Sequence, residues 1–541
     1  EYINTHKFAI DYDDMLKYAR SESRDYYYEL RRDFYNKNNK VLNLNESYES
    51  SPFITYQTRE IIQDIAGISD TLYYVLNDSN VIKMYISTLH TLDTQIGPIE
   101  CVTQTCTTGP VAPTPIDPNY DISVALETSN ITDLLNIYSG NGVKIGIHEG
   151  WYSPAYGFNA TSGLINRYNL AISPAYVNYF VNKAEKSNHA TLVASIAGGN
   201  YGVARDASFL STEIVSTSEG IFDYFDFAPL QWQVLNQNVN VINMSFSVFS
   251  FMNESNNYNA LARKYDKFAC DNLVVIVVSS GNALGSDYKT GTPGNANNLI
   301  TVGGTEIDGN QRYPSSRYVE NPIYNTSVQK PTLVAPGKMW VPYNPFYSEQ
   351  SPYNEYVPFG TSLAAPIVTG AIALAMQAKP FLKVYPELVH SLITSTADSS
   401  SFSYNDYRGG LEDQIGAGLI NASCFVQTAI SENYFLFTNN LNAPGEIEST
   451  VISVNAGQTL KSSLFWFSQI SSNLNSRTIT PYKLRIEQLD GTLIEEIEFP
   501  NNLLIIEHTF SYNQTIRLSV VLTYAKSGAN LDKGAVSWNI Y

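Results

Sequence analysis

One eight-residue segment constrains this chain more than any other. Residues 359–366 read Phe-Gly-Thr-Ser-Leu-Ala-Ala-Pro and lead into a long apolar run. Pro366 fits an α-helix only in its first turn, where its missing N–H costs no intrahelical bond. The segment therefore predicts a buried helix that begins just before Ser362. Unpaired backbone N–H groups at such a helix start can stabilise a developing oxyanion, which makes Ser362 a candidate nucleophile.

A serine nucleophile needs a base, and the base needs a carboxylate that orients it. The chain has six histidines. His189 opens the run Asn-His-Ala-Thr-Leu-Val-Ala-Ser-Ile-Ala-Gly-Gly, in which an apolar helix is expected to begin. Glu149 ends the strand-like run Val-Lys-Ile-Gly-Ile-His-Glu. Because successive strand residues point to opposite faces, His148 and Glu149 cannot both face His189, and His148 is expected to be a buried, hydrogen-bonded neighbour.

These segments resemble the motifs of the subtilases, the subtilisin-like serine peptidases. In that family the acid, the histidine and the serine follow one another in this order, and here they are 189 − 149 = 40 and 362 − 189 = 173 residues apart. The resemblance covers about residues 117–428 and implies a catalytic triad of Glu149, His189 and Ser362. It departs from the family at Glu149, where Asp is usual, and at Ala190, where Gly is usual.

Two further segments acquire a role from the resemblance. The run Val-Val-Ile-Val-Val-Ser-Ser-Gly-Asn-Ala is similar to the family strand that ends at the oxyanion asparagine, which implies that Asn282 stabilises the oxyanion. The run Asn-Val-Ile-Asn-Met-Ser-Phe-Ser is similar to the strand that binds the substrate, which implies that Ser245, Phe246 and Ser247 contact an extended peptide. No cofactor is expected to be required. Structural calcium is common in the family, but no acidic loop has the spacing that would predict a site.

The pattern along the chain predicts three regions and a linker. Residues 117–430 alternate short β-branched runs with helical stretches, which predicts a doubly wound parallel sheet wrapped by helices. With the resemblance described above, this implies a subtilisin-like α/β domain. Residues 431–541 predict a C-terminal all-β sandwich. Residues 1–106 predict a mainly helical accessory or propeptide-like region, and residues 107–116 a linker rich in Pro and Thr. The candidate parallel strands are Val143–Ile147, Ser208–Ile214, Val239–Met244, Leu273–Ser279 and Leu299–Val302.

Composition narrows the classes of partner. The net charge is 33 − 51 = −18, which argues against a nucleic-acid partner. The sequence has no apolar run that suggests a membrane span. Cys101 and Cys106 can pair, whereas Cys270 and Cys424 are expected to be buried thiols. The resemblance to the subtilases implies a secreted or cell-surface protein that acts on protein or peptide substrates, and the sequence does not set its oligomeric state.

Two other functions compete with a serine endopeptidase. The altered acid and the extra regions are compatible with a catalytically silent subtilase that binds a partner. Alternatively, residues 431–541 can be the functional part of a surface adhesin.

Overall fold

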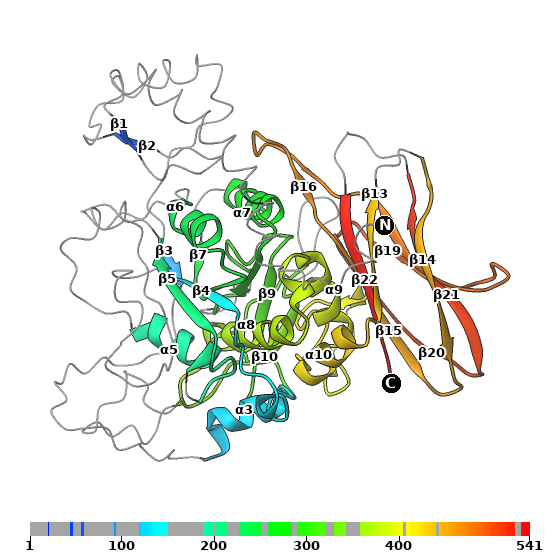
Figure 1. Cartoon of the computed structure of the whole chain (residues 1–541), viewed down its shortest axis with the longest axis horizontal. Helices are drawn as coiled ribbons and strands as arrows, with labels where there is room; N and C mark the ends of the chain where they lie inside the picture. The colour runs from blue at the N-terminus through cyan, green and yellow to red at the C-terminus, as the bar shows by residue number, and fades with distance from the viewer. Residues whose placement is uncertain are drawn as a thin grey trace, which may run out of the picture.

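The computed structural model describes residues 20, 44–46, 56–58, 91–93, 118–149, 188–199, 201–214, 227–249, 258–283, 289–319, 329–341, 357–403, 407–439, 443–524 and 532–541. In these ranges a parallel sheet wrapped by helices lies beside a pair of antiparallel sheets (Figure 1). Most of the predicted region 1–106 and the linker 107–116 fall outside the description. The pieces described there include the short strands β1 (Leu44–Glu46), β2 (Tyr56–Thr58) and β3 (Thr91–Asp93).

The parallel sheet has six strands in the order β10-β9-β8-β6-β4-β5. Their bounds are β4 Lys144–Glu149, β5 Ser208–Glu213, β6 Val241–Met244, β8 Val275–Ser279, β9 Ile300–Thr305 and β10 Leu333–Pro336. Every neighbouring pair is parallel. The chain adds β5 on one side of β4 and β6 on the other, so the strand order reverses at β4. Open α/β sheets bind their ligands outside the carboxyl ends of the strands at such a reversal.

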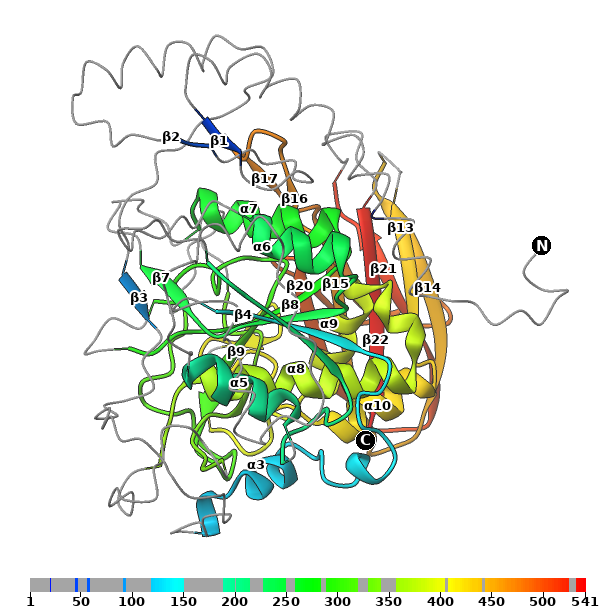
Figure 2. The same ribbon diagram turned by 60° about the vertical axis from the view of Figure 1, so that its left-hand side comes forward.

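The prediction of a doubly wound α/β domain is confirmed. One apolar core packs α5 (Asn188–Gly198) and α8 (Thr361–Ala378) on one face of the sheet. A second core packs α6 (Ala228–Gln231) and α7 (Ala260–Asp271) on the other face (Figure 2). All five candidate strands are present with slightly different ends. Strand β10 was not among them, because four residues that end at Pro336 give little strand signal.

Helix α8 runs through the centre of the larger core. It is long and apolar enough to cross a membrane, but 89% of its apolar stretch is buried inside the protein. Its neighbours include α5, β6, β8 and β9. The helix therefore serves as a core element, and its N-terminus meets the carboxyl edge of the sheet.

The C-terminal part contains two antiparallel four-stranded sheets, as the all-β prediction requires. One has the order β13-β22-β15-β20 and the other β14-β21-β18-β19. Their bounds are β13 Tyr434–Asn439, β14 Gly445–Val454, β15 Thr459–Trp466, β18 Tyr482–Gln488, β19 Leu493–Glu498, β20 Leu503–Thr509, β21 Gln514–Leu522 and β22 Asp532–Ile540. The core that they share includes Trp466, whose ring meets that of Tyr482 edge to face at 5.3 Å.

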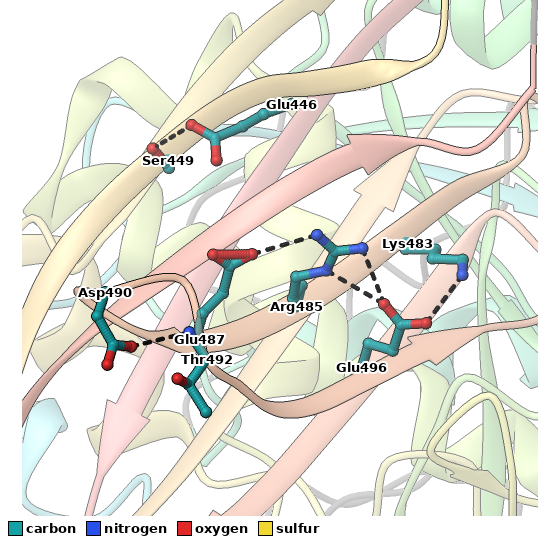
Figure 3. A network of polar contacts seen from close by, with 8 residues as sticks. All are labelled: Glu446, Ser449, Lys483, Arg485, Glu487, Asp490, Thr492 and Glu496. Atoms are coloured by element: carbon teal, nitrogen blue, oxygen red, sulfur yellow. Dashed lines mark hydrogen bonds and ion pairs between the residues drawn. The ribbon is translucent and has the colours of Figure 1, made fainter.

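Charged side chains cover the outer face of the second sheet (Figure 3). Glu496 of the edge strand β19 accepts hydrogen bonds from Lys483 at 2.9 Å and from Arg485 at 3.0 Å. Exposed ion pairs of this kind add little stability, about 0–1 kcal/mol. Their charge does discourage another strand from pairing with the open edge.

A polar interface joins the sandwich to the parallel-sheet part. Helix α9 (Pro386–Ser395) packs on β15 and β22. The Ser391 hydroxyl donates to the Ser463 carbonyl at 2.7 Å, and the hydroxyls of Ser395 and Ser537 lie 2.8 Å apart. Lys461 of β15 donates to the Ala397 carbonyl at 2.6 Å. All of these polar groups are buried, so their partners are needed to offset desolvation.

Gly370 sets how closely α8 approaches α5. A Cβ at this position would lie 2.4 Å from the Cβ of Val203 and 2.8 Å from the Ala197 carbonyl. We predict that Gly370→Ala lowers the free energy of unfolding by about 1–3 kcal/mol through overpacking, although alanine favours helix by about 1 kcal/mol. The matched control is Gly304→Ala, whose Cβ would meet nothing closer than 3.6 Å. Equal stability of both variants in urea unfolding would contradict this packing.

Candidate active site

Five segments that lie far apart in the sequence supply the candidate residues. Glu149 is the last residue of β4, Ser245 directly follows β6, and Asn282 lies three residues beyond β8. His189 and Ser362 are each the second residue of a helix, α5 and α8. The carboxyl ends of parallel strands share one edge, so the sheet brings the strand residues to the edge at which α8 begins.

The structure joins Glu149 and His189 directly. Nδ1 of His189 lies 2.8 Å from Oε2 of Glu149. A carboxylate only accepts hydrogen bonds, so Nδ1 carries the proton, and the neutral ring presents a lone pair at Nε2. Among the described residues, Nε2 of His189 and Oε1 of Glu149 are buried without a hydrogen-bond partner. Glu149 thus anchors the imidazole through one oxygen, and the opposite ring nitrogen is left for a proton transfer.

Ser362 does not donate to His189 in this structure. Its Oγ donates to the Ser245 carbonyl at 3.1 Å, and the Ser245 hydroxyl donates to the Ser362 carbonyl at 3.2 Å. The two serines therefore hold each other through both their hydroxyls and their backbones. Ser362 is 1% exposed, and as the second residue of α8 it has no intrahelical acceptor for its N–H.

Asn282 is tied to the start of the same helix. Its Oδ1 accepts from the Thr361 N–H at 3.0 Å, and the Gly281 N–H donates to the Thr361 hydroxyl at 3.1 Å. The first of these bonds fixes which half of the amide is oxygen. Buried Arg317 stabilises the turn that contains Asn282, because its Nε donates to the Asn282 carbonyl at 3.0 Å. Sequence reasoning missed Arg317, which lies in a segment without a motif.

His148 faces away from the candidate acid, as the strand alternation predicts. Its Nδ1 lies 2.9 Å from the hydroxyl of Thr212 on the neighbouring strand, and its ring meets Phe246 edge to face at 5.8 Å. Burial lowers the pKa of His148 to about 3, so the ring is neutral at ordinary pH. It supports the strand end and does not compete for Glu149.

The predicted substrate-binding residues lie at or next to strand β7, whose edge is already paired with another segment of the same chain. Strand β7 (Ser247–Phe249) pairs antiparallel with β3, with Ser247 opposite Asp93 and Val248 opposite Leu92. Both views place β3 against β7 (Figures 1 and 2). Ser245, Phe246 and Ser247 are fully buried, and Phe246 belongs to the second core. The pairing with residues 91–93 was not predicted, because three residues carry no recognisable strand pattern.

The other candidate reactive side chains are the possible metal ligands and the cysteine thiols of the described ranges. There, no group of three or more His, Cys, Asp or Glu residues is placed to hold a metal ion. Cys270 and Cys424 are free, as expected, but only partly buried. Desolvation raises the pKa of Cys270 to about 12, which makes its thiol a poor nucleophile. Cys101 and Cys106 lie outside the described residues.

A sequence model of the subtilase family matches residues 157–418. That range contains His189, Asn282 and Ser362 and begins after Glu149. Subtilisin-like protease 2 of Trichophyton rubrum is 29% identical over 215 residues, which cover 37% of this chain and 44% of that protein. Subtilisin-like protease 2 of Arthroderma otae is 31% identical over 209 residues, which cover 36% of this chain and 42% of that protein. The chain thus spans less than half of the length of these relatives.

The crystal structure of MycP1 without its N-terminal propeptide covers 56% of this chain and 96% of its own, with 20% identity and a TM-score of 0.39. A protease from Pseudoalteromonas arctica covers 59% of this chain and all of its own, with 20% identity and a TM-score of 0.40. The motifs, the sheet of parallel strands and the family-model match over residues 157–418 together support a subtilisin-like serine peptidase domain in this part of the chain.

Proposed function

We propose that the chain is a serine endopeptidase that hydrolyses peptide bonds of protein substrates through an acyl-enzyme. The observation that carries the proposal is the 2.8 Å contact between Glu149 and Nδ1 of His189, which leaves Nε2 buried and unpaired in the described part of the chain. An imidazole held in this tautomer is prepared to accept the proton of a serine hydroxyl. The similarity of residues 157–418 to the subtilase family supports the same reaction class.

The proposed first half-reaction begins with a rotation of Ser362. Its hydroxyl leaves the Ser245 carbonyl and turns to Nε2 of His189, a change that substrate binding can bring about, since catalytic hydrogen bonds often tighten only in the complex. Oγ then attacks the scissile carbonyl carbon while His189 takes the proton. The amide of Asn282 and the Ser362 N–H stabilise the oxyanion. The C–N bond breaks, and His189 returns the proton to the leaving amine.

The second half-reaction repeats these steps with water. His189 takes a proton from water, whose oxygen attacks the acyl ester, and Ser362 leaves with the proton regained. An extended substrate would add as a strand near Ser245–Ser247. Because β3 pairs with β7 there, a substrate strand in this position would replace residues 91–93. We also propose that the protein acts outside the cell or at its surface.

Covalent labelling tests the nucleophile. We predict that a fluorophosphonate labels the intact chain once, at Ser362, and that Ser362→Ala abolishes labelling. His189→Ala should slow peptide hydrolysis by about 10⁶-fold, as found when one member of such a unit is removed. Intact-mass spectrometry locates the adduct. A folded protein that takes up no label would support the silent-subtilase alternative instead.

The side-chain length at position 149 gives a second test. Glu149→Asp withdraws the carboxylate by one methylene from a 2.8 Å contact, and we predict a loss of about 10²-fold in kcat, since misplacement by about 1 Å costs this much. Glu149→Gln should cost about 10⁴-fold by disturbing the tautomer. The exposed Glu127 of α3 (Ile122–Thr128) offers Glu127→Asp as a matched control. Unchanged kcat in Glu149→Gln would exclude Glu149 as the acid.

A further inference from the structure

Four buried polar side chains form a ladder between β6 and α8. Ser362 and Thr369 are seven residues apart on α8, which is about two turns, so they share one face of the helix. Asn243 and Ser245 are two residues apart and share one side of the extended chain. Asn243, Ser245 and Thr369 are 0% exposed and Ser362 is 1% exposed. Apolar residues next to these positions on α8 belong to the larger core, among them Leu363 and Val368.

The hydrogen bonds of the ladder run in one direction. The Thr369 hydroxyl lies 3.0 Å from Oδ1 of Asn243 and 3.1 Å from the Ala365 carbonyl, so its one proton is shared between these two acceptors. Nδ2 of Asn243 donates to the Ser245 hydroxyl at 2.9 Å. A hydroxyl has one proton, so Ser245, which accepts from Asn243, donates its own proton to the Ser362 carbonyl at 3.2 Å. The ladder ends on the backbone of the candidate nucleophile.

We propose that Thr369 is a positioning residue for the nucleophile and acts through Asn243 and Ser245. The share of its proton that Thr369 gives to Oδ1 favours the orientation of the Asn243 amide with Nδ2 toward Ser245. Without that donor the amide can turn its oxygen to Ser245, whose proton then goes to Asn243 and no longer to the Ser362 carbonyl. The first turn of α8 then loses its hydrogen bond from the Ser245 hydroxyl, at the strand end that the substrate is proposed to contact. This inference rests on the proposed function.

The ladder differs in kind from a buried group that serves stability alone. Each member is satisfied by the next, as burial requires, but only the last bond reaches the nucleophile. Loss of the Thr369 hydroxyl is therefore expected to lower the reactivity of Ser362 as well as the stability of the protein, which loses stability because Oδ1 of Asn243 is left unpaired. A net hydrogen bond of about 0.5–1.5 kcal/mol corresponds to a change in rate of roughly twofold to tenfold.

The experiment measures fluorophosphonate labelling of the full chain, with the maximal inactivation rate kinact separated from the inhibitor constant KI. We predict that Thr369→Val, which keeps the shape and removes the hydroxyl, lowers kinact about threefold to tenfold with KI unchanged. Thr369→Ser should restore the wild-type rate. Thr428→Val, at a buried threonine of α10 (Ala422–Ile430), is the matched control and should label like wild type.

A double-mutant cycle tests the route of the effect. Ser245→Ala should lower kinact by a similar factor, and Ser245→Ala combined with Thr369→Val should lose no more than the larger single effect. If Thr369→Val does not fold, Ser245→Ala alone carries the test. A folded Thr369→Val or Ser245→Ala variant that labels at the wild-type rate overturns the inference. If the wild-type protein itself is not labelled, the proposed function fails instead.

Discussion

The burial of α8 is the constraint on which the rest of the site depends. A helix this apolar must lie inside the protein, and it packs against the parallel sheet, α5 and α10. Gly370 permits the close approach to the segment after α5. Once the helix is buried, its N-terminus lies at the carboxyl edge of the sheet, where Glu149, Ser245 and Asn282 are also brought. The packing at Gly370, about two helical turns from Ser362, therefore helps to determine which residues surround Ser362.

The polar groups at this edge are arranged by the same packing. The Thr361 N–H binds Oδ1 of Asn282, and Ser245 bonds reciprocally with Ser362. These bonds lie inside the protein, where an unpaired group would cost about 1–3 kcal/mol. They therefore specify one position for the helix start relative to β6 and β8. Nε2 of His189 and Oε1 of Glu149 are among the buried side-chain atoms of the described residues that have no hydrogen-bond partner.

The sequence predicted the parts of the site that are carried by strong local patterns. An apolar run after Gly-Thr-Ser identified α8, and strand alternation correctly separated Glu149 from His148. It could not predict the ladder from Thr369 to Ser245, because that pairing depends on how β6 packs against α8. Arg317 and β3 were missed for the same reason, since each acquires its role from a distant partner. The limits of the predicted domains remain predictions.

A crystal structure of the chain with a fluorophosphonate bound to Ser362 tests the central claim most directly. We predict a phosphonyl oxygen within hydrogen-bond distance of Nδ2 of Asn282 and the Ser362 N–H, with the Ser245 carbonyl released from Oγ. His189 should keep Nδ1 on Glu149 and direct Nε2 toward the phosphonylated oxygen. An adduct in which His189 has turned away from Glu149, or in which Asn282 points elsewhere, would contradict the assignment of these residues as one catalytic unit.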